Sequence, residues 1–257
     1  MTAPPPLLPP HVRGLLLDID GTLLTGDHAI PGAPAALARL TAAGLRVRLL
    51  TNTSRRGRSS IGATLRGAGF AIDDGAILTP ALLARRLIRG AGAPRAALFV
   101  TPDTRRDLDG IEDDRGRPDW LVLGDLGDGF SHATLGEALR LLLTGARLVA
   151  LHRHTWWTPP GGRPVLDVGA YVAALEAASG RAALLVGKPA RPFFDLALQE
   201  IGLQAAEVAV IGDDAEADGA GAIAAGCEAI LVLTGTHRAG APAPARVPVI
   251  GSIADLA

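Results

Sequence analysis

The sequence of 257 residues contains one cysteine, Cys227, and few aromatic side chains: three Trp, one Tyr and five Phe. A single cysteine cannot form a disulfide within the chain, so a domain held together by disulfides is excluded and a reducing, cytoplasmic compartment is expected. Because aromatic residues are scarce, Ala, Leu, Val and Ile must fill the hydrophobic core. The length is sufficient to bury such a core without a structural metal.

An excess of charge of either sign is also lacking, since 25 Lys and Arg stand against 26 Asp and Glu and the formal net charge is −1. Nucleic acids and anionic membranes attract strongly basic surfaces, so neither is expected as a partner. No stretch of about 18 residues is free of charges, prolines and glycine clusters, and therefore no transmembrane span is predicted. An apolar share of 48% excludes a disordered chain and predicts a folded soluble protein.

The first residues differ in composition from the rest. Residues 1–10 contain five prolines and no basic residue. They lack the charged start of a signal peptide, and we expect residues 1–11 to form a disordered leader.

Short apolar runs alternate along the chain with segments of helical spacing. Apolar runs without strict alternation are typical of strands that are buried on both faces. The pattern predicts an α/β fold with a doubly wound, mainly parallel sheet, whose ligands bind at the carboxyl ends of the strands. The charged stretch 107–118 is expected to be a loop. The expected strands are 14–19, 45–50, 96–100, 120–123, 146–151, 208–211 and 229–233, and the expected helices are 33–43, 55–69, 134–143, 169–179, 191–201 and 215–225.

Acidic residues directly follow two of the apolar runs. The first run ends in the string DIDGT, which contains Asp18 and Asp20, and the run 208–211 leads into GDDAEAD, which contains Asp213, Asp214 and Asp218. If these strand ends are neighbours, the carboxylates repel one another unless a hard divalent cation joins them, and Mg²⁺ is the expected cation. The alternative interpretations are an Asp-rich loop start for the first string and an acidic first helical turn for Asp214.

Two further strand ends carry groups that suit an oxyanion. Thr51, Asn52 and Thr53 follow the run 45–50 and precede an expected helix, so their hydroxyl and amide groups can hydrogen-bond a phosphate. An ordinary turn with Ser54 as the helix cap explains the same residues. Lys188, in the string GKP before the helix 191–201, can neutralise a phosphate with its ammonium group.

Taken in order, the motifs DxDGT, Thr-Asn, GKP and GDDxxxD resemble the signature of the haloacid dehalogenase (HAD) superfamily of hydrolases, over essentially the whole chain. The resemblance implies a HAD-like Rossmannoid core, a Mg²⁺ cofactor and an aspartyl-phosphate intermediate. Superfamily members that act on carbon–halogen bonds lack the second aspartate of the first motif. Its presence here, as Asp20, therefore favours phosphoryl transfer.

The roles that the resemblance implies agree with the chemistry of the residues. Asp18 is expected to be the nucleophile, and Asp20 is expected to protonate the leaving oxygen and then to activate water. The implied Mg²⁺ ligands are the carboxylates of Asp18 and Asp213 and the backbone carbonyl of Asp20. The remaining implied residues are the phosphate-binding Thr51, Asn52, Thr53 and Lys188, and Asp214 and Asp218, which would orient Lys188 or metal-bound water.

About 136 residues separate Thr51 from Lys188, too many for one connection between a strand and a helix. This insert resembles the C2-type α/β cap of HAD subclass IIA. The WW pair at 156–157 and the string LDVG at 166–169 are most similar to the phospholysine phosphohistidine inorganic pyrophosphate phosphatase-like branch. We therefore expect a core of residues 12–78 and 184–257, an inserted smaller cap of residues 79–183, and a possible homodimer through the cap.

The segment 152–157 of the expected cap concentrates histidine and tryptophan. One interpretation is a loop in which His152, Arg153 or His154 meets an anionic substrate and Trp156 or Trp157 covers it. The alternative is that the tryptophans pack in the cap core or in a dimer contact. A zinc site is not expected, because no cysteine or third histidine lies nearby in the sequence.

The function predicted is a Mg²⁺-dependent phosphatase of a small phosphorylated metabolite: a phosphomonoester, a phosphoamide or pyrophosphate. A phosphotransferase using the same intermediate is the alternative within enzymes. A phosphoacceptor module like a receiver domain is disfavoured because such domains are shorter and have no cap, and a silent binding protein is disfavoured because all four motifs are filled. His237 and Arg238, near the end of the chain, resemble the family's TGxxR ending and are expected at the surface.

Overall fold

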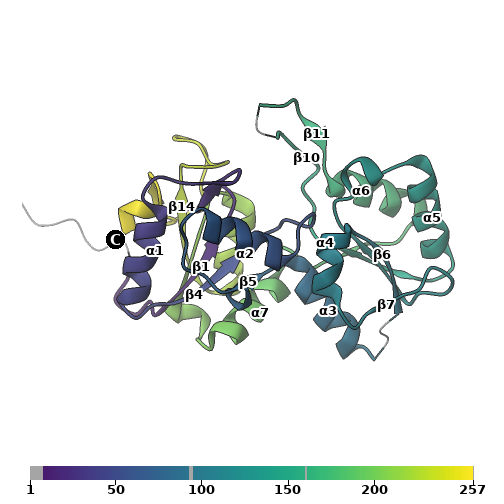
Figure 1. Ribbon diagram of the computed structural model, residues 1–257, viewed down its shortest axis with the longest axis horizontal. Helices are drawn as coiled ribbons and strands as arrows, with labels where there is room; N and C mark the ends of the chain where they lie inside the picture. Colours follow the sequence, from purple (N-terminus) through teal and green to yellow (C-terminus); the bar gives the residue numbers. More distant parts are fainter. Residues whose placement is uncertain (1–7, 93–94, 160, 257) are drawn as a thin grey trace, which may run out of the picture. The chain divides into compact units, whose positions relative to one another are not determined.

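The computed structural model describes residues 8–92, 95–159 and 161–256. Its internal contacts divide the chain into two compact units: a core domain of residues 1–51, 61–78 and 188–257, and a cap domain of residues 52–60 and 79–187. Figure 1 shows both domains. Residues 1–7 of the expected leader lie outside the described residues, whereas Leu8 already packs against the hydrophobic cluster of the core domain.

The domain division differs from the sequence expectation in two places. Residues 184–187 belong to the cap because β12 (Leu184–Leu185) pairs with β9 (Arg147–Ala150). Residues 52–60 also belong to the cap, where the backbone N–H of Gly57 donates to Asp103 Oδ2 over 2.9 Å. Hydrogen bonds between segments far apart in the sequence therefore set these boundaries, and local composition does not reveal them.

The core domain contains one sheet of six parallel strands in the order β15-β14-β13-β1-β4-β5. From β1 the chain adds β4 and β5 on one side, and it then returns to add β13, β14 and β15 on the other side. The direction of winding therefore changes between β1 and β13, which confirms the doubly wound parallel sheet and marks the position where such sheets bind ligands. The strands are β1 (Gly14–Asp18), β4 (Arg46–Leu50), β5 (Ile77–Leu78), β13 (Val208–Gly212), β14 (Glu228–Val232) and β15 (Val249–Ile250).

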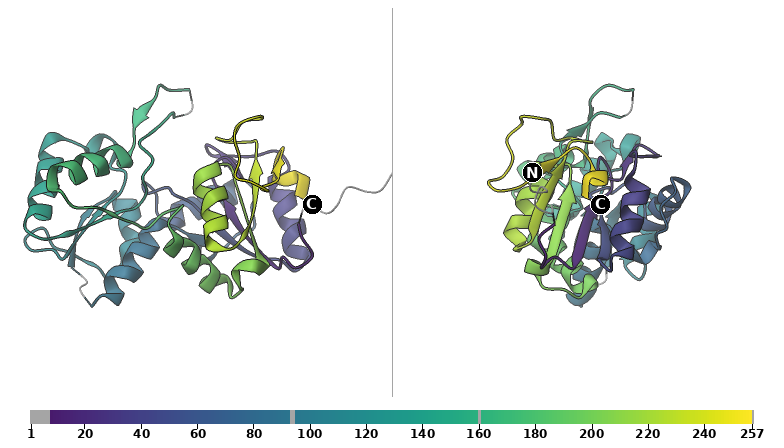
Figure 2. Two further views of the ribbon diagram at one scale, coloured as in Figure 1. Left: turned by 180° about the vertical axis from the view of Figure 1, so that it is seen from behind. Right: turned by 90° about the vertical axis from the view of Figure 1, so that its left-hand side faces the viewer.

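Helices cover both faces of this sheet, and Figure 2 shows α1 (Ala33–Ala42) and α7 (Arg191–Ile201) on opposite sides. Leu15 and Leu17 of β1 point to the face that also buries Leu37 of α1. Leu16, between them, points to the other face and is equally buried. The strand is therefore apolar throughout. The other elements are β2 (Leu24–Thr25), β3 (His28–Ala29), α2 (Arg58–Gly67), a π-helix (Ala215–Ala220), α8 (Gly221–Ala225) and the 3₁₀ turns Asp74–Ala76, Ala205–Glu207 and Ile253–Leu256.

The cap domain has its own sheet of five parallel strands in the order β12-β9-β8-β6-β7 and its own hydrophobic cluster. Helices α5 and α6 lie side by side on one face of this sheet (Figure 2). Alternate strand residues such as Phe99 and Leu121 face them and are buried. The elements are α3 (Pro80–Gly90), β6 (Arg95–Phe99), α4 (Pro102–Arg105), β7 (Glu112–Asp113), β8 (Trp120–Leu123), α5 (His132–Leu143), β10 (Trp156–Trp157), β11 (Val165–Leu166), α6 (Val168–Ser179) and the 3₁₀ turns Arg106–Leu108 and Gly127–Gly129.

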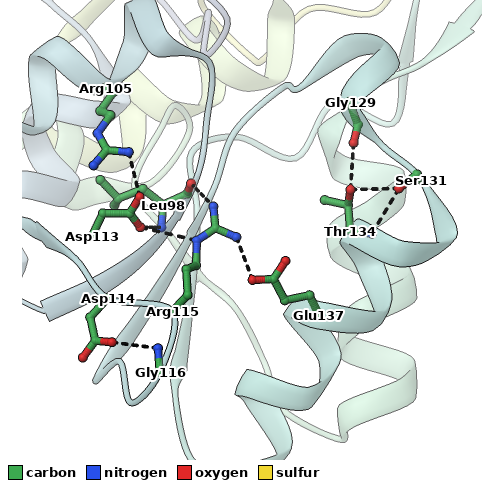
Figure 3. Close-up of polar contacts among 10 residues, drawn as sticks. All are labelled: Leu98, Arg105, Asp113, Asp114, Arg115, Gly116, Gly129, Ser131, Thr134 and Glu137. Carbon is green, nitrogen blue, oxygen red and sulfur yellow. Dashed lines mark hydrogen bonds and ion pairs between the residues drawn. The ribbon is translucent and has the colours of Figure 1, made fainter.

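The charged stretch 107–118 is not only the loop that the sequence predicts, because it contains β7, which pairs with β6 at the edge of the cap sheet. Figure 3 shows why its charges are tolerated. Arg115 donates to the carbonyl oxygen of Leu98 (2.8 Å) and to Glu137 (3.1 Å), and Arg105 pairs with Asp113 (2.7 Å). Asp113 and Arg115 of this segment are thus paired within the cap domain.

Three other local features differ from the sequence expectation. Helix α3 lies in a stretch for which no helix is predicted, and the expected helix 215–225 is a π-helix followed by a short α-helix. Ser54 is not a helix cap, because α2 begins only at Arg58; its Oγ instead accepts a hydrogen bond from the backbone N–H of Asp125 (2.8 Å). Within the part of the chain that the structure describes, no helix has the length and apolar character needed to cross a membrane.

Candidate active site

Three carboxylates meet at the point where the core sheet changes its winding direction. Parallel register aligns Leu17 of β1 with Ile211 of β13, so that Asp18 at the end of β1 lies beside the residues that follow β13. One carboxylate oxygen each of Asp18, Asp213 and Asp218 lies within 4.8 Å of the other two, and all three side chains are buried. Three of the carboxylates expected to converge therefore lie together in the core domain, and Asp20 is not in this group.

Lys188 lies between two of these carboxylates. Its ammonium group donates to Asp18 Oδ1 over 2.5 Å and to Asp218 Oδ1 over 2.6 Å, and only 3% of the residue is exposed. Burial by itself lowers the pKa of Lys188, but the charges of Asp18 and Asp218 outweigh it and raise the pKa above its ordinary value. Lys188 therefore remains a cation at the pH of the cell.

One ammonium group does not compensate the whole carboxylate cluster. Burial raises the pKa of Asp18 well above its ordinary value against the opposing charge of Lys188, and Asp218 and Asp213 raise it further. Burial also raises the pKa of Asp213. Both pKa shifts indicate that an additional negative charge in this buried cluster is unfavourable. A cluster of hard oxygen donors with excess negative charge is suited to a divalent cation such as Mg²⁺, with Asp18 and Asp213 as ligands.

The second and third aspartates of the GDDAEAD string, Asp214 and Asp218, have different roles. Asp214 caps the π-helix, since its Oδ1 accepts from the backbone N–H groups of Glu216 and Ala217, both at 2.8 Å. This is the helix-start interpretation left open by the sequence. Asp218 holds Lys188, and its Oδ2 accepts from the backbone N–H of Asp214 (3.1 Å). Of these two aspartates, Asp218 is therefore the one in contact with Lys188.

The other motif residues, Asp20 and residues 51–53, follow the ends of β1 and β4. Thr51 follows the end of β4, which is aligned with Asp18, and it is 1% exposed. Asp20 is exposed at the start of the turn after β1. Asn52 and Thr53 are half-buried and group with the cap domain by their contacts. A side chain on Gly187 would meet Asn52 Oδ1 at 2.7 Å, so the residues that follow Thr51 and precede Lys188 lie against each other.

The last loop of the core domain contributes support that the sequence analysis missed. Thr236 donates its backbone N–H to Asp213 Oδ2 (2.5 Å), and Thr234 Oγ1 donates to the carbonyl oxygen of Gly21 (2.6 Å). His237, which the sequence predicts to lie at the surface, is buried, and its backbone N–H donates to the carbonyl oxygen of Asp213 (2.8 Å). The string TGT at 234–236 after an apolar run was the only available signal for this loop.

Glycines make the close approach of these segments possible. A side chain on Gly21, whose φ is +84°, would collide with the carboxylate of Asp213. A side chain on Gly212, the last residue of β13, would collide with the carboxylate of Asp218. These two glycines therefore allow buried aspartates to pack against the backbone at the strand ends.

The five candidate residues of the cap differ in exposure. His152 is buried, and burial together with the nearby His154 lowers its pKa to about 3, so it is neutral. Arg153 is paired with both carboxylate oxygens of Glu176, at 2.6 and 3.0 Å. Trp156 and Trp157 lie in β10 and are 62% and 37% exposed, so they do not pack in the cap core.

Comparison with known proteins agrees with the geometry of the core site. Residues 15–111 match the family model of haloacid dehalogenase-like hydrolases, and residues 185–256 match the HAD-hydrolase-like model. The chain is 39% identical over 233 residues to the phospholysine phosphohistidine inorganic pyrophosphate phosphatase of Bos taurus, which covers 88% of this chain and 85% of the relative.

Solved structures share the fold over almost the whole chain. A 4-nitrophenylphosphatase from Thermotoga maritima matches with a TM-score of 0.88 and 28% identity, over 96% of both chains. A glycerol phosphate phosphatase from Mycobacterium tuberculosis, in complex with magnesium, matches with a TM-score of 0.85 and 28% identity, over 96% of this chain and 76% of the other. The resemblance found in the sequence motifs is confirmed, and the chain belongs to the haloacid dehalogenase-like hydrolases.

Proposed function

We propose that the protein is a Mg²⁺-dependent phosphatase that hydrolyses a small phosphorylated metabolite through an aspartyl-phosphate on Asp18. The observation that carries the proposal is the buried group of Asp18, Lys188, Asp213 and Asp218 at the switch point of the core sheet. The bovine relative is named for phospholysine, phosphohistidine and pyrophosphate, so we propose a phosphoamide, pyrophosphate or a phosphomonoester as the substrate class.

The motif residues are proposed to divide the reaction as follows. A carboxylate oxygen of Asp18 forms a bond to phosphorus while the bond to the leaving oxygen or nitrogen breaks, and Asp20 donates a proton to the leaving atom. Water, deprotonated by Asp20, then attacks phosphorus and releases inorganic phosphate and the free Asp18 carboxylate. Lys188 holds Asp18 Oδ1 and, with Thr51, Asn52 and Thr53, provides donors for the phosphoryl oxygens.

A divalent cation held by Asp18, Asp213 and the carbonyl oxygen of Asp20 would neutralise the charge that opposes the approach of a phosphate to a carboxylate. The chemistry of the donor set fits this role, because the cluster offers only hard oxygens and has more carboxylates than ammonium groups. Asp218 contributes by orienting Lys188.

The cap is proposed to select the substrate. His154, Trp156 and Trp157 are exposed members of the segment expected to meet it, whereas Arg153, although exposed, is engaged by Glu176. We also propose a cytoplasmic location, which the single, buried Cys227 supports.

A homodimer through the cap is a further part of the proposal. Light scattering that gives the mass of a monomer at all working concentrations would contradict it.

The test is a substrate panel with 4-nitrophenyl phosphate, glycerol phosphate, phospholysine, phosphohistidine and pyrophosphate, each with Mg²⁺ or with a chelator. Asp18→Asn is expected to reduce turnover by about 10³-fold or more, because an amide is a poor nucleophile. Asp20→Asn is expected to slow alkyl phosphates more than 4-nitrophenyl phosphate, whose leaving group needs less protonation. Chelation is expected to abolish turnover of all substrates.

The matched control is Asp195→Asn, which makes the same chemical change at an exposed aspartate paired with Arg191 (2.8 Å). This variant is expected to keep the parent rate. An Asp18→Asn variant as active as the parent would disprove the nucleophile, and a rate that chelation leaves unchanged would disprove the metal. Transfer of phosphate to added alcohols in preference to water would identify a phosphotransferase instead.

A further inference from the structure

A second group of potential metal ligands lies in the cap domain. His152 and His154 precede β10, and Asp167 directly follows β11 and caps the N-terminus of α6. Thus the group sits where the β10–β11 hairpin leaves the body of the cap and returns to it. Zinc is not predicted from the sequence, because no cysteine or third histidine lies near His152 and His154 in the chain. The fold supplies Asp167, thirteen residues beyond His154, as a third ligand.

The backbone holds the three residues together. The N–H of Asp167 donates to the carbonyl oxygen of Thr155 (2.9 Å), and the N–H of Gly169 donates to the carbonyl oxygen of His154 (2.8 Å). A side chain on Gly169 would meet the carbonyl oxygen of His154 at 2.6 Å, so only glycine lets the first turn of α6 come this close. The positions of the ligands thus follow from the fold.

The ligand atoms of the three residues lie near one another, and one pair is close to the spacing found around a metal ion. One ligand atom of each residue lies within 4.8 Å of the other two, and His152 Nε2 is 3.7 Å from Asp167 Oδ1. Ligand atoms on a tetrahedral zinc with bonds of about 2.0 to 2.1 Å are about 3.3 Å apart. The observed pair is too far apart for a direct hydrogen bond, and a contraction of a few tenths of an ångström brings it to the distance that a shared ion requires.

His152 packs edge to face against His154, but one of its ring nitrogens is buried without a partner. The residue is 4% exposed, and among the described residues its Nδ1 has no hydrogen-bond partner. A buried histidine that serves only packing is expected to satisfy its ring nitrogens, because an unpaired buried polar atom costs about 1 to 3 kcal/mol. A neutral imidazole beside a second imidazole and a carboxylate is the arrangement that a divalent transition metal binds.

We propose that His152, His154 and Asp167 form a binding site for a divalent transition metal of the zinc class in the cap domain, separate from the carboxylate cluster of the core domain. Two imidazoles and one carboxylate favour zinc over magnesium, which prefers oxygen ligands only. His154 is exposed, so an ion can enter from solvent and a water molecule can fill the fourth position.

Such an ion would join the two ends of the hairpin. The ligands flank β10 and β11, whose pairing consists of two residues on each strand, and the hairpin carries the exposed Trp156 and Leu166. A two-stranded hairpin is marginally stable by itself. A metal at its base would therefore order the exposed part of the cap that includes Trp156 and Trp157.

The experiment titrates the full chain, without a histidine tag, with Zn²⁺ by calorimetry and with Co²⁺ by visible absorption, both in excess Mg²⁺. One equivalent is expected to bind. His154→Ala and Asp167→Asn are expected to weaken the binding at least about 10-fold. Asn at position 167 can still accept the hydrogen bond from Val168 N–H (2.6 Å), so this variant preserves the helix cap. Zn²⁺ is also expected to slow amide hydrogen exchange in residues 152–159 and 161–170.

His132→Ala is the matched control, because His132 is an exposed histidine of the cap outside the cluster. It is expected to bind Zn²⁺ like the parent. The proposal is wrong if His154→Ala binds as tightly as the parent or if no Zn²⁺ binds. It is also wrong if Asp213→Asn, which alters the core cluster, abolishes the binding. Because these measurements do not use turnover, they are independent of the proposed phosphatase activity.

Discussion

At the scale of single residues, the identity of Lys188 is more informative than its charge. It is the only lysine among 25 basic residues, and the other 24 are arginines. The ammonium group is a compact point charge that fits between two buried carboxylates, at 2.5 Å from one and 2.6 Å from the other. A guanidinium is planar and larger and would need more space. The position therefore demands lysine for steric as well as electrostatic reasons.

Removing the ammonium group is expected to cost stability as well as activity. Lys188→Met leaves Asp18 and Asp218 buried without their cation, and a broken buried ion pair costs about 3 to 5 kcal/mol. Mg²⁺ at about 100 times its dissociation constant is expected to restore about 2.7 kcal/mol by binding only the folded state. Denaturant unfolding with and without Mg²⁺ measures both effects.

Lys188→Arg tests the steric part of the argument, and we expect it to be inactive and less stable than the parent. Arg191→Lys is the control, since it makes the reverse exchange three positions further on at an exposed ion pair. It is expected to leave stability within about 0.5 kcal/mol of the parent. A fully active Lys188→Arg variant would contradict the need for a compact cation.

At the scale of secondary structure, the site depends on how strands end. Parallel register places Asp18 beside Leu50 of β4, and β1 beside β13, so the residues after three strands are brought to one sheet edge. The turn after β13 is a π-helix, whose wider winding carries Asp218 back against Gly212 at the end of its own strand. The strand end and the π-helix thus act as one unit that aims Asp218 at Lys188.

Gly212→Ala is expected to disturb this unit, because the added methyl group would overlap the carboxylate of Asp218. Asp218 must then move away from Lys188, and we expect a loss of about 1 to 3 kcal/mol of stability together with at least a 10-fold loss of turnover. Gly67→Ala in α2 is the control, since nothing lies within 4 Å of its added methyl group, and it is expected to be neutral or to stabilise by up to about 1 kcal/mol. Equal effects of the two changes on turnover would contradict the role of Gly212.

At the scale of the whole molecule, the core domain and the cap domain each contain a hydrophobic cluster of their own, and these two clusters share no residue. The core cluster includes Leu65 and the cap cluster includes Leu142, both fully buried. Because each cluster belongs to a compact unit with its own sheet, loss of packing in one unit is expected to affect chiefly that unit. Insertion of the cap between β5 and the segment that begins at Lys188 therefore leaves the core sheet complete.

Leu142→Ala and Leu65→Ala form a matched pair of cavity-forming substitutions, each expected to cost about 2 to 5 kcal/mol. Leu142→Ala is expected to speed amide hydrogen exchange in β8 and β9 while β1 and β13 keep the parent rates, and Leu65→Ala is expected to do the reverse. Hydrogen exchange with mass spectrometry resolves the two sets of strands. If either variant accelerates both sets equally, the two domains unfold as one unit.

The fold class, and the proximity of the motif residues that follow the strands, could be predicted from the sequence alone. Apolar runs such as 120–123 match the observed strands because strands buried on both faces need continuous apolar residues. The motif residues follow the strands directly, and parallel strands end at one edge, so their proximity could be predicted without coordinates. The charged edge strand β7 was missed because it is only two residues long. The helix α3 was also missed, although Leu83 and Leu87 recur in it at helical spacing.

Only the tertiary structure decided which groups are in contact. Lys188 is 170 residues from Asp18 in the chain, and Asp218 rather than Asp214 reaches it. The boundary at residue 187, the contact of Ser54 with Asp125 and the grouping of Asp167 with two histidines are likewise contacts between separate segments. Local patterns report which residues can be buried or can begin a turn, whereas partners distant in sequence depend on how sheets and helices pack.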